Sequence, residues 1–174
     1  FKEPILLVTP IPSETKSTNF DLTFAFDSFE YNNDVTLSNG FLRTFARIND
    51  NKLTLDKEVH IEAQSIGWRN QLLAESGIFK IQDLSLTPVN GTLPYPSKLH
   101  AILNNTTWQQ EKNLSIDCEI DFSETPYIHP QVSITKSNQW LQADLYVDTS
   151  KKIVNIYSSG HAKIDTIENH LPYQ

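Results

Sequence analysis

The stretch Asn113-Leu-Ser-Ile-Asp-Cys-Glu-Ile-Asp-Phe122 alternates apolar and polar residues one for one. Successive Cβ atoms leave opposite faces of an extended chain, so this period of two predicts a strand with one dry and one wet face. The residues expected on the dry face are Leu114, Ile116, Cys118, Ile120 and Phe122. Asp117, Glu119 and Asp121 on the other face indicate a solvated acidic surface rather than a calcium site, because one strand spaces alternate residues too widely to chelate an ion.

The same alternation recurs along most of the chain and divides it into about eleven candidate strands separated by polar turns. We expect them at residues 4–9, 19–27, 34–37, 41–48, 52–63, 78–86, 99–103, 114–122, 131–135, 140–147, 152–157 and 162–167. Regularly spaced short strands are typical of antiparallel all-β folds. The sequence therefore predicts an antiparallel β-sandwich or jelly roll of about ten strands, with at most one short helix.

Three local features refine this prediction. Pro10 and Pro12 remove backbone donors, so the first strand is expected at a sheet edge or as a lead-in from a preceding domain. Ser38-Asn39-Gly40 carries the Asn-Gly signal of a tight hairpin, which predicts a turn between residues 34–37 and 41–48. Helical spacing of apolar residues competes only within residues 67–77, where Gly77 is positioned to cap a short helix; a loop that turns through one helical turn is the open alternative.

Composition bounds the function mainly by exclusion. A chain of 174 residues is long enough for one domain, residues 1–174, with a sizeable core. The net charge of −7 argues against a nucleic-acid partner, and no run of about 18 apolar residues is present to insert in a membrane. The chain starts at Phe1 and contains no Met, so we expect a piece of a longer chain or a processed N-terminus.

No motif predicts catalysis, a metal site or a cofactor. The Gly-x-Ser-x-Gly elbow is absent, glycines never cluster, and the five histidines show no metal-binding spacing. They are His60, His100, His129, His161 and His170. Cys118 is the only cysteine, so the chain forms no internal disulfide, and the thiol is expected to be buried as a small hydrophobe. Four glycosylation sequons begin at Asn90, Asn104, Asn105 and Asn113, which is near the number expected by chance.

Aromatic residues in polar or proline-fixed loops are the remaining candidates for a binding site. Trp108 and Trp140 each follow a strongly polar stretch, and Tyr95 and Tyr127 lie beside prolines. A flat ring can cover the apolar face of a sugar while nearby amides and carboxylates bind its hydroxyls. The alternative is that the two tryptophans fold inward and plug the ends of the sandwich.

In architecture this pattern is similar to the β-sandwich heads of phage and viral receptor-binding proteins. The resemblance implies an extracellular, virion or cell-surface binding module that recognises a glycan or protein receptor, and a homotrimer. One alternative is a structural or assembly protein of a secretion system, pilus or phage baseplate. Its distinguishing feature would be an exposed apolar edge, for which residues 4–8 are the candidate. A carbohydrate-active enzyme is a third hypothesis, because distant carboxylates can meet in a fold.

Overall fold

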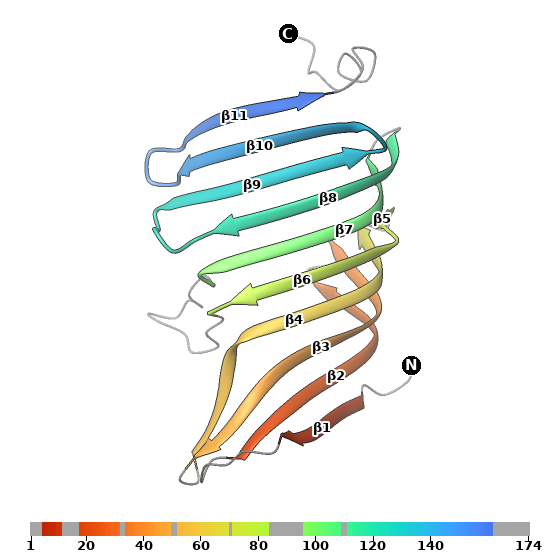
Figure 1. Cartoon of the computed structure of the whole chain (residues 1–174), viewed down its shortest axis with the longest axis vertical. Helices are drawn as coiled ribbons and strands as arrows, with labels where there is room; N and C mark the ends of the chain where they lie inside the picture. Colours follow the sequence, from red (N-terminus) through yellow and green to blue (C-terminus); the bar gives the residue numbers. More distant parts are fainter. Residues whose placement is uncertain are drawn as a thin grey trace.

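The structure is a computed structural model of the whole chain, and it describes residues 5–11, 18–31, 34–49, 52–69, 71–83, 96–108 and 111–161. Its strands are β1 (Ile5–Ile11), β2 (Thr18–Tyr31), β3 (Val35–Asn49), β4 (Lys52–Trp68), β5 (Gln71–Ala74), β6 (Ser76–Gln82), β7 (Lys98–Trp108), β8 (Glu111–Asp121), β9 (Tyr127–Lys136), β10 (Gln139–Asp148) and β11 (Ile153–His161) (Figure 1). No helix occurs among the described residues.

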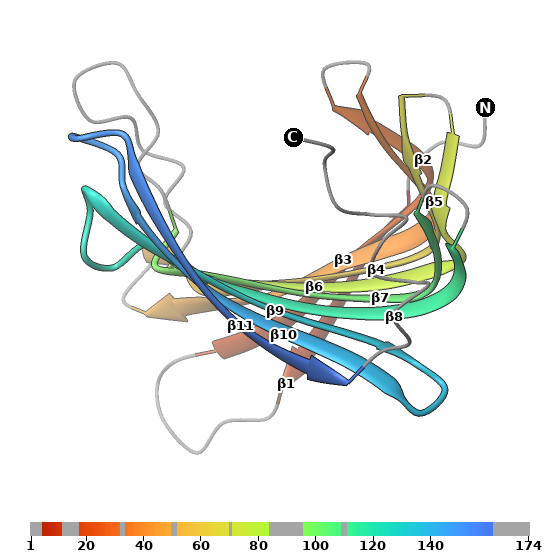
Figure 2. The ribbon, with the colours of Figure 1, turned by 90° about the horizontal axis from the view of Figure 1, so that it is seen from above.

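All eleven strands belong to one antiparallel sheet, and the predicted all-β antiparallel class is confirmed. The strands follow one another as a meander in the order β1-β2-β3-β4-β6-β7-β8-β9-β10-β11, with β5 paired to β4. The sheet curves strongly, so that the two ends of the strands rise on either side of one face (Figure 2). The fold is sandwich-like in that these ends face each other, although the sheet is continuous.

One local prediction from the sequence was wrong, and one segment that the sequence left open between helix and loop is mostly strand. Asn39 and Gly40 do not form a hairpin turn but lie inside β3, which runs unbroken from Val35 to Asn49. Residues 67–77 hold no helix among their described members; they contain the end of β4, the short strand β5 and the start of β6. In both places the pairing of long neighbouring strands prevails over a local signal, because tertiary context overrides weak propensity.

The bend of the sheet is marked by asparagines with left-handed backbone. Asn39 in β3 has φ 50°, Asn105 in β7 has φ 50°, and Asn113 in β8 has φ 60°. Asparagine tolerates this region better than other residues with a Cβ atom, and single left-handed residues are typical of bulges that turn a strand. The β7–β8 register also shifts between Leu103 and Thr106. The Asn-Gly signal at position 39 therefore reports a bend within a strand and not its end.

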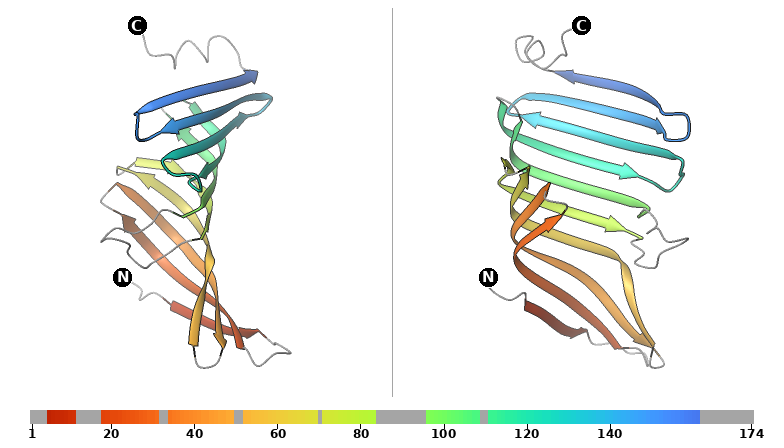
Figure 3. Two further views of the ribbon diagram at one scale, coloured as in Figure 1. Left: turned by 90° about the vertical axis from the view of Figure 1, so that its left-hand side faces the viewer. Right: turned by 180° about the vertical axis from the view of Figure 1, so that it is seen from behind.

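The first and last strands of the meander leave the two sides of the sheet open. β1 pairs only with β2, and β11 only with β10, among the strands that the structure describes. The prediction that the first strand lies at an edge is confirmed. The further views show the same arrangement from the side and from behind (Figure 3).

Candidate functional site

One face of the sheet is apolar across its whole width. Residues opposite each other in an antiparallel ladder point to the same side, so the register of the strands defines rows of side chains that cross the sheet. The central row is Leu6, Phe24, Leu42, Ile61, Phe79, Ala101, Cys118, Val132, Ala143 and Ser158. The rows beside it include Val8, Leu22, Thr44, Val59, Ile81, Leu99, Ile120 and Pro130, and Phe26, Gly40, Ala63, Gly77, Leu103, Ile116, Ile134, Leu141 and Gly160. These three rows contain no charged residue, and we call them the concave face.

The apolar rows lie on the inner side of the curve. Side chains converge on the inside of a bend, so residues there must be small, and the row at the bend contains Gly40, Ala63 and Gly77. A Cβ atom at Gly77 would stand 2.6 Å from Cδ1 of Ile66 and 3.1 Å from Cδ2 of Leu103. The most deeply buried cluster of the chain also lies here and comprises Leu37, Ala63, Ile66 and Ala74.

Away from the bend, the concave face stays open. Phe24 is 37% exposed, Leu141 45% and Ile156 63%, and no second layer of described strands covers them. Because exposing apolar side chains to water is unfavourable, this face is suited to covering by an apolar partner.

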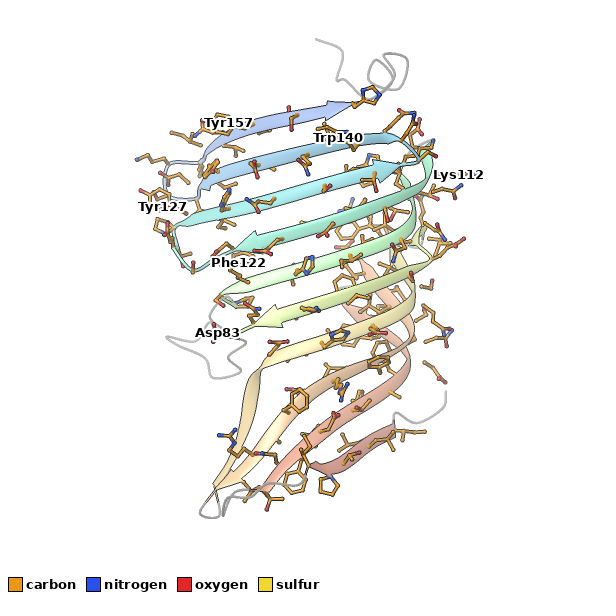
Figure 4. The ribbon with its side chains drawn as sticks, viewed as in Figure 1. Asp83, Lys112, Phe122, Tyr127, Trp140 and Tyr157 are labelled. Carbon is orange, nitrogen blue, oxygen red and sulfur yellow. The ribbon has the colours of Figure 1, made fainter. Side chains whose placement is uncertain are left out.

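The outer, convex face is mostly polar over the middle of the sheet (Figure 4). Its central row contains Arg43, His60, Lys80, His100, Glu119, Gln131 and Asp144. Many of these charges are paired across strands. His100 Nε2 lies 2.7 Å from an Asp117 oxygen, and Lys98 Nζ lies 3.0 Å from Glu119 Oε1.

Hydrogen bonds shift the pKa values of two charged groups on the convex face, Asp21 and Lys98. Arg43 Nε donates to Asp21 at 2.9 Å, and this bond holds the pKa of the Asp21 carboxyl below its ordinary value. The hydrogen bond to Glu119 raises the pKa of the Lys98 ammonium. Both effects favour the charged forms of Asp21 and Lys98. The contrast between a charged outer face and an uncharged inner face is the main chemical feature of the molecule.

A second, smaller candidate site lies near the turns that follow β8 and β10. A pocket of about 470 Å³ there is lined partly by Asp121, Tyr127, His129, Tyr146 and Asn155. The His129 ring stacks on Tyr146 with centroids 4.2 Å apart, and its Nε2 atom is buried without a hydrogen-bond partner. Tyr146 in turn meets Tyr157 edge to face. The pocket thus combines exposed aromatic rings with carboxylate and amide groups.

The aromatic residues singled out from the sequence do not form one site. Tyr127 opens β9 and pairs with Asp148, whereas Trp140 pairs with Thr135 near the other end of β9. Eight residues of strand separate these two positions, which is about 26 Å. Figure 4 shows them at opposite sides of the sheet. Tyr127 alone reaches the pocket beside His129.

Trp108 ends β7, beyond the bend, and is 56% exposed. Trp140 is 40% exposed and shares the convex face with Gln142 and Asp144. Neither ring is buried as a plug at the end of the sheet. Tyr95 lies outside the described residues.

Cys118 has the predicted register but not the predicted burial. It lies on the concave face with Ile116 and Ile120, yet it is only partly buried, because no second layer of described strands covers that face. Desolvation by its apolar neighbours, with a smaller effect of the Asp117 charge, raises the pKa of the Cys118 thiol. The thiol is thereby less reactive than a free one.

Two of the four sequon asparagines have amide groups engaged within the fold. Asn105 Nδ2 donates to Glu75 at 2.8 Å, and Asn104 accepts from Ser115 Oγ at 3.0 Å. Asn113 occupies a left-handed position at the bend. Asn90 lies outside the described residues. Three of these asparagines thus have a structural role within the fold.

Among the residues that the structure describes, no three His, Cys, Asp or Glu side chains are grouped to hold a metal ion. The same part of the chain contains no helix that is long and apolar enough to cross a membrane. Comparison of the chain with protein-family models, with curated proteins and with solved structures gave no match in any of the three. The geometry and chemistry of the two faces are therefore the basis on which a function is inferred.

Sequence reasoning located the residues of the concave face but assigned them to a covered core. Alternation shows which side chains share a face and does not show whether a second layer packs on it. The aromatic cluster of His129, Tyr146 and Tyr157 was not anticipated. The only signal for it was the presence of two tyrosines on the polar side of their strands, at Tyr146 and Tyr157.

Proposed function

We propose that this chain is a non-catalytic binding module that holds the hydrocarbon chains of lipids along its concave face. The observation that carries this proposal is the absence of any charged residue from the three rows of that face, of which the central row crosses ten strands. Ten strands spaced by about 4.8 Å span roughly 40 Å. The hydrocarbon core of a bilayer is about 30 Å thick and each acyl chain spans half of it, or about 15 Å. The concave face is wider than one such chain is long and therefore has room for more than one.

Curvature favours a lipid over a protein partner. A second sheet packs on a first at about 10 Å with its side chains interdigitated, which requires two surfaces that follow each other. A second copy facing this one would meet it mainly at the raised strand ends and would leave the middle unfilled. Flexible hydrocarbon adapts to a curved surface and needs no hydrogen-bond partner. The polar lipid headgroup would remain at the open side, in water.

The proposal is tested by photo-crosslinking with a matched pair of positions. Benzoylphenylalanine replaces Leu141 on the concave face or Gln142, the next residue, on the convex face; both side chains are exposed. The purified variants are irradiated with a fluorescent phosphatidylethanolamine. We expect at least tenfold more labelling from position 141. Val132 and Gln131 on β9 provide a second matched pair.

Equal labelling from the two faces, or none from either, would contradict the proposal. Circular dichroism of each variant checks that the strand content is retained. A further variant, Val132→Asp, places a charge in the central row and should abolish labelling from position 141. Gln131→Asp, on the other face, should leave it unchanged.

A glycan receptor is a second candidate ligand, and the pocket beside His129 supports it. Tyr127 and Tyr146 line this pocket with rings that are 53% and 48% exposed, next to carboxylates and Asn155, and Tyr157, 64% exposed, lines an adjoining pocket with Asp144 and Tyr146. This composition suits stacking and hydrogen bonding to a sugar. In that case the chain would act as an attachment module at a virion or cell surface. A glycan array of the purified chain tests it, and Tyr157→Ala should remove a hit that Trp140→Ala leaves intact.

A further inference from the structure

The two open edges of the sheet have complementary directions. The continuous path contains ten strands, and each is antiparallel to the next, so β11 runs opposite to β1. If one copy were placed beside another without turning it over, β11 of the first would meet β1 of the second as an antiparallel pair. The meander would then continue across the junction with the same hand and the same inner face.

Both edges also have the composition of strands that pair. β1 contains no charged residue, and its residues Ile5 to Val8 are between 52% and 59% exposed. β11 is exposed at every position and contains no proline, lysine or carboxylate. Natural edge strands are usually blunted by such residues, and a long apolar edge without them is a template for another strand. Pro10 removes one donor near the end of β1, which limits pairing there to residues 5–9.

We propose that copies of this chain join edge to edge, with β11 of one copy pairing with β1 of the next, so that their concave faces form one longer apolar surface. The occupant of each edge is thus a second copy of the chain. The concave rows cross the junction without a charged residue, because Ser158 on β11 ends the row that begins at Leu6 on β1, and Ile156, the preceding β11 residue on that face, lies beside it. The contact is heterologous and open-ended, and therefore builds chains of subunits.

A two-fold contact of β11 with β11 fits the curvature less well. The bend that Asn39, Asn105 and Asn113 mark lies near the same end of all three of their strands. Head-to-tail addition keeps these bends in line from copy to copy. A two-fold axis would place the bent ends of the two copies on opposite sides and would leave β1 exposed. The edge contact does not require a bound lipid, although it extends the surface on which the proposed function depends.

Cysteine crosslinking separates the two contacts. In a Cys118→Ala background, Leu7→Cys lies on β1 and Asn155→Cys on β11, both on the convex face of an edge. Ile5→Cys and Thr9→Cys cover neighbouring registers. Copies of different mass are mixed and oxidised. We expect heterodimers between one of the β1 variants and Asn155→Cys, several-fold above the Asn155→Cys homodimer.

Gln142→Cys, which is exposed on β10 one strand inward, is the control and should not crosslink to β1. Homodimers of Asn155→Cys alone, or a chain that sediments as a monomer at every concentration up to the millimolar range, would overturn the proposal. A second test blocks the edge contact. The double variant Asn155→Lys, Tyr157→Lys places two charges on the β11 edge and should convert assemblies to monomers. Both positions lie off the concave face, so lipid labelling from position 141 in this monomer tests the proposed function separately.

Discussion

Ile66 Cδ1 lies 2.6 Å from the point that a Cβ atom of Gly77 would occupy. This contact joins the end of β4 to the start of β6 on the inside of the bend. Gly77 is buried and belongs to the same concave row as Ala63 and Leu103. The curvature of the sheet, and with it the concave face, therefore depends on the absence of a side chain at position 77.

Gly77→Ala should destabilise the fold. The added methyl group forces Ile66 or the backbone to move, and overpacking of this kind costs about 1–3 kcal/mol. Urea unfolding followed by circular dichroism measures the change. The matched control is Gly67→Ala on β4, where the nearest atom to a Cβ is 3.4 Å away and ordinary contact results. A free energy of unfolding equal in both variants would show that the bend does not constrain position 77.

Asp148→Asn should lower stability at neutral pH but not at low pH. The Asp148 carboxylate accepts from Ser150 N at 3.0 Å and Lys151 N at 3.0 Å in the turn before β11. The Ser150 hydroxyl, which also donates to it, makes the largest contribution to lowering the pKa of Asp148 below 3.8. A carboxyl with a lowered folded pKa stabilises the fold above its unfolded pKa, and this contribution is lost as pH falls through the folded value. Asparagine keeps an acceptor oxygen but no charge.

The measurement is the free energy of unfolding of wild type and variant between pH 7 and pH 2. The difference between the two should be largest near pH 7 and should vanish at the acidic end. Asp144→Asn, an exposed position on the same strand, provides the control. A difference that is constant with pH would mean that the charge of Asp148 has no role in the turn.

Cys118 should report on occupation of the concave face. Partial burial and a raised pKa predict that the native thiol reacts with an aromatic disulfide reagent more slowly than the thiol of the urea-unfolded chain. Adding the fluorescent phosphatidylethanolamine should slow the reaction further, because hydrocarbon would cover the row that contains Cys118. As a reference, Asn155→Cys in a Cys118→Ala background should react at a rate that lipid does not change. Rapid labelling of native Cys118 would contradict its register on the inner face.

Trp108→Ala should change stability by no more than about 0.5 kcal/mol, because the ring is exposed beyond the bend. Phe79→Ala provides the contrast, since Phe79 packs against the buried cluster that contains Ile66. Removing a packed phenylalanine costs about 3 kcal/mol. Thermal unfolding of both variants tests the difference. If Trp108→Ala were the more destabilising substitution, the ring would be part of the core and could not be offered to a ligand.

The sequence by itself determined the strands and their faces. The alternation around Cys118 correctly placed Ile116, Cys118 and Ile120 on one side, and Pro10 correctly indicated an edge strand. Both signals act over a few residues: a period of two follows from the geometry of an extended chain, and proline lacks a donor wherever it stands. Such properties depend only on residues that are neighbours in the sequence, so they can be recognised without the tertiary structure.

Only the tertiary structure decided how the strands are arranged and what covers them. Asn39-Gly40 has the same local preference for left-handed backbone in a hairpin turn and at a bend, and the pairing of β3 with β2 and β4 over its full length selects the bend. An apolar row has the same sequence whether it meets a second sheet or remains open, because burial is a property of residues distant in the chain. The concave face of this protein is therefore a consequence of one curved, continuous sheet.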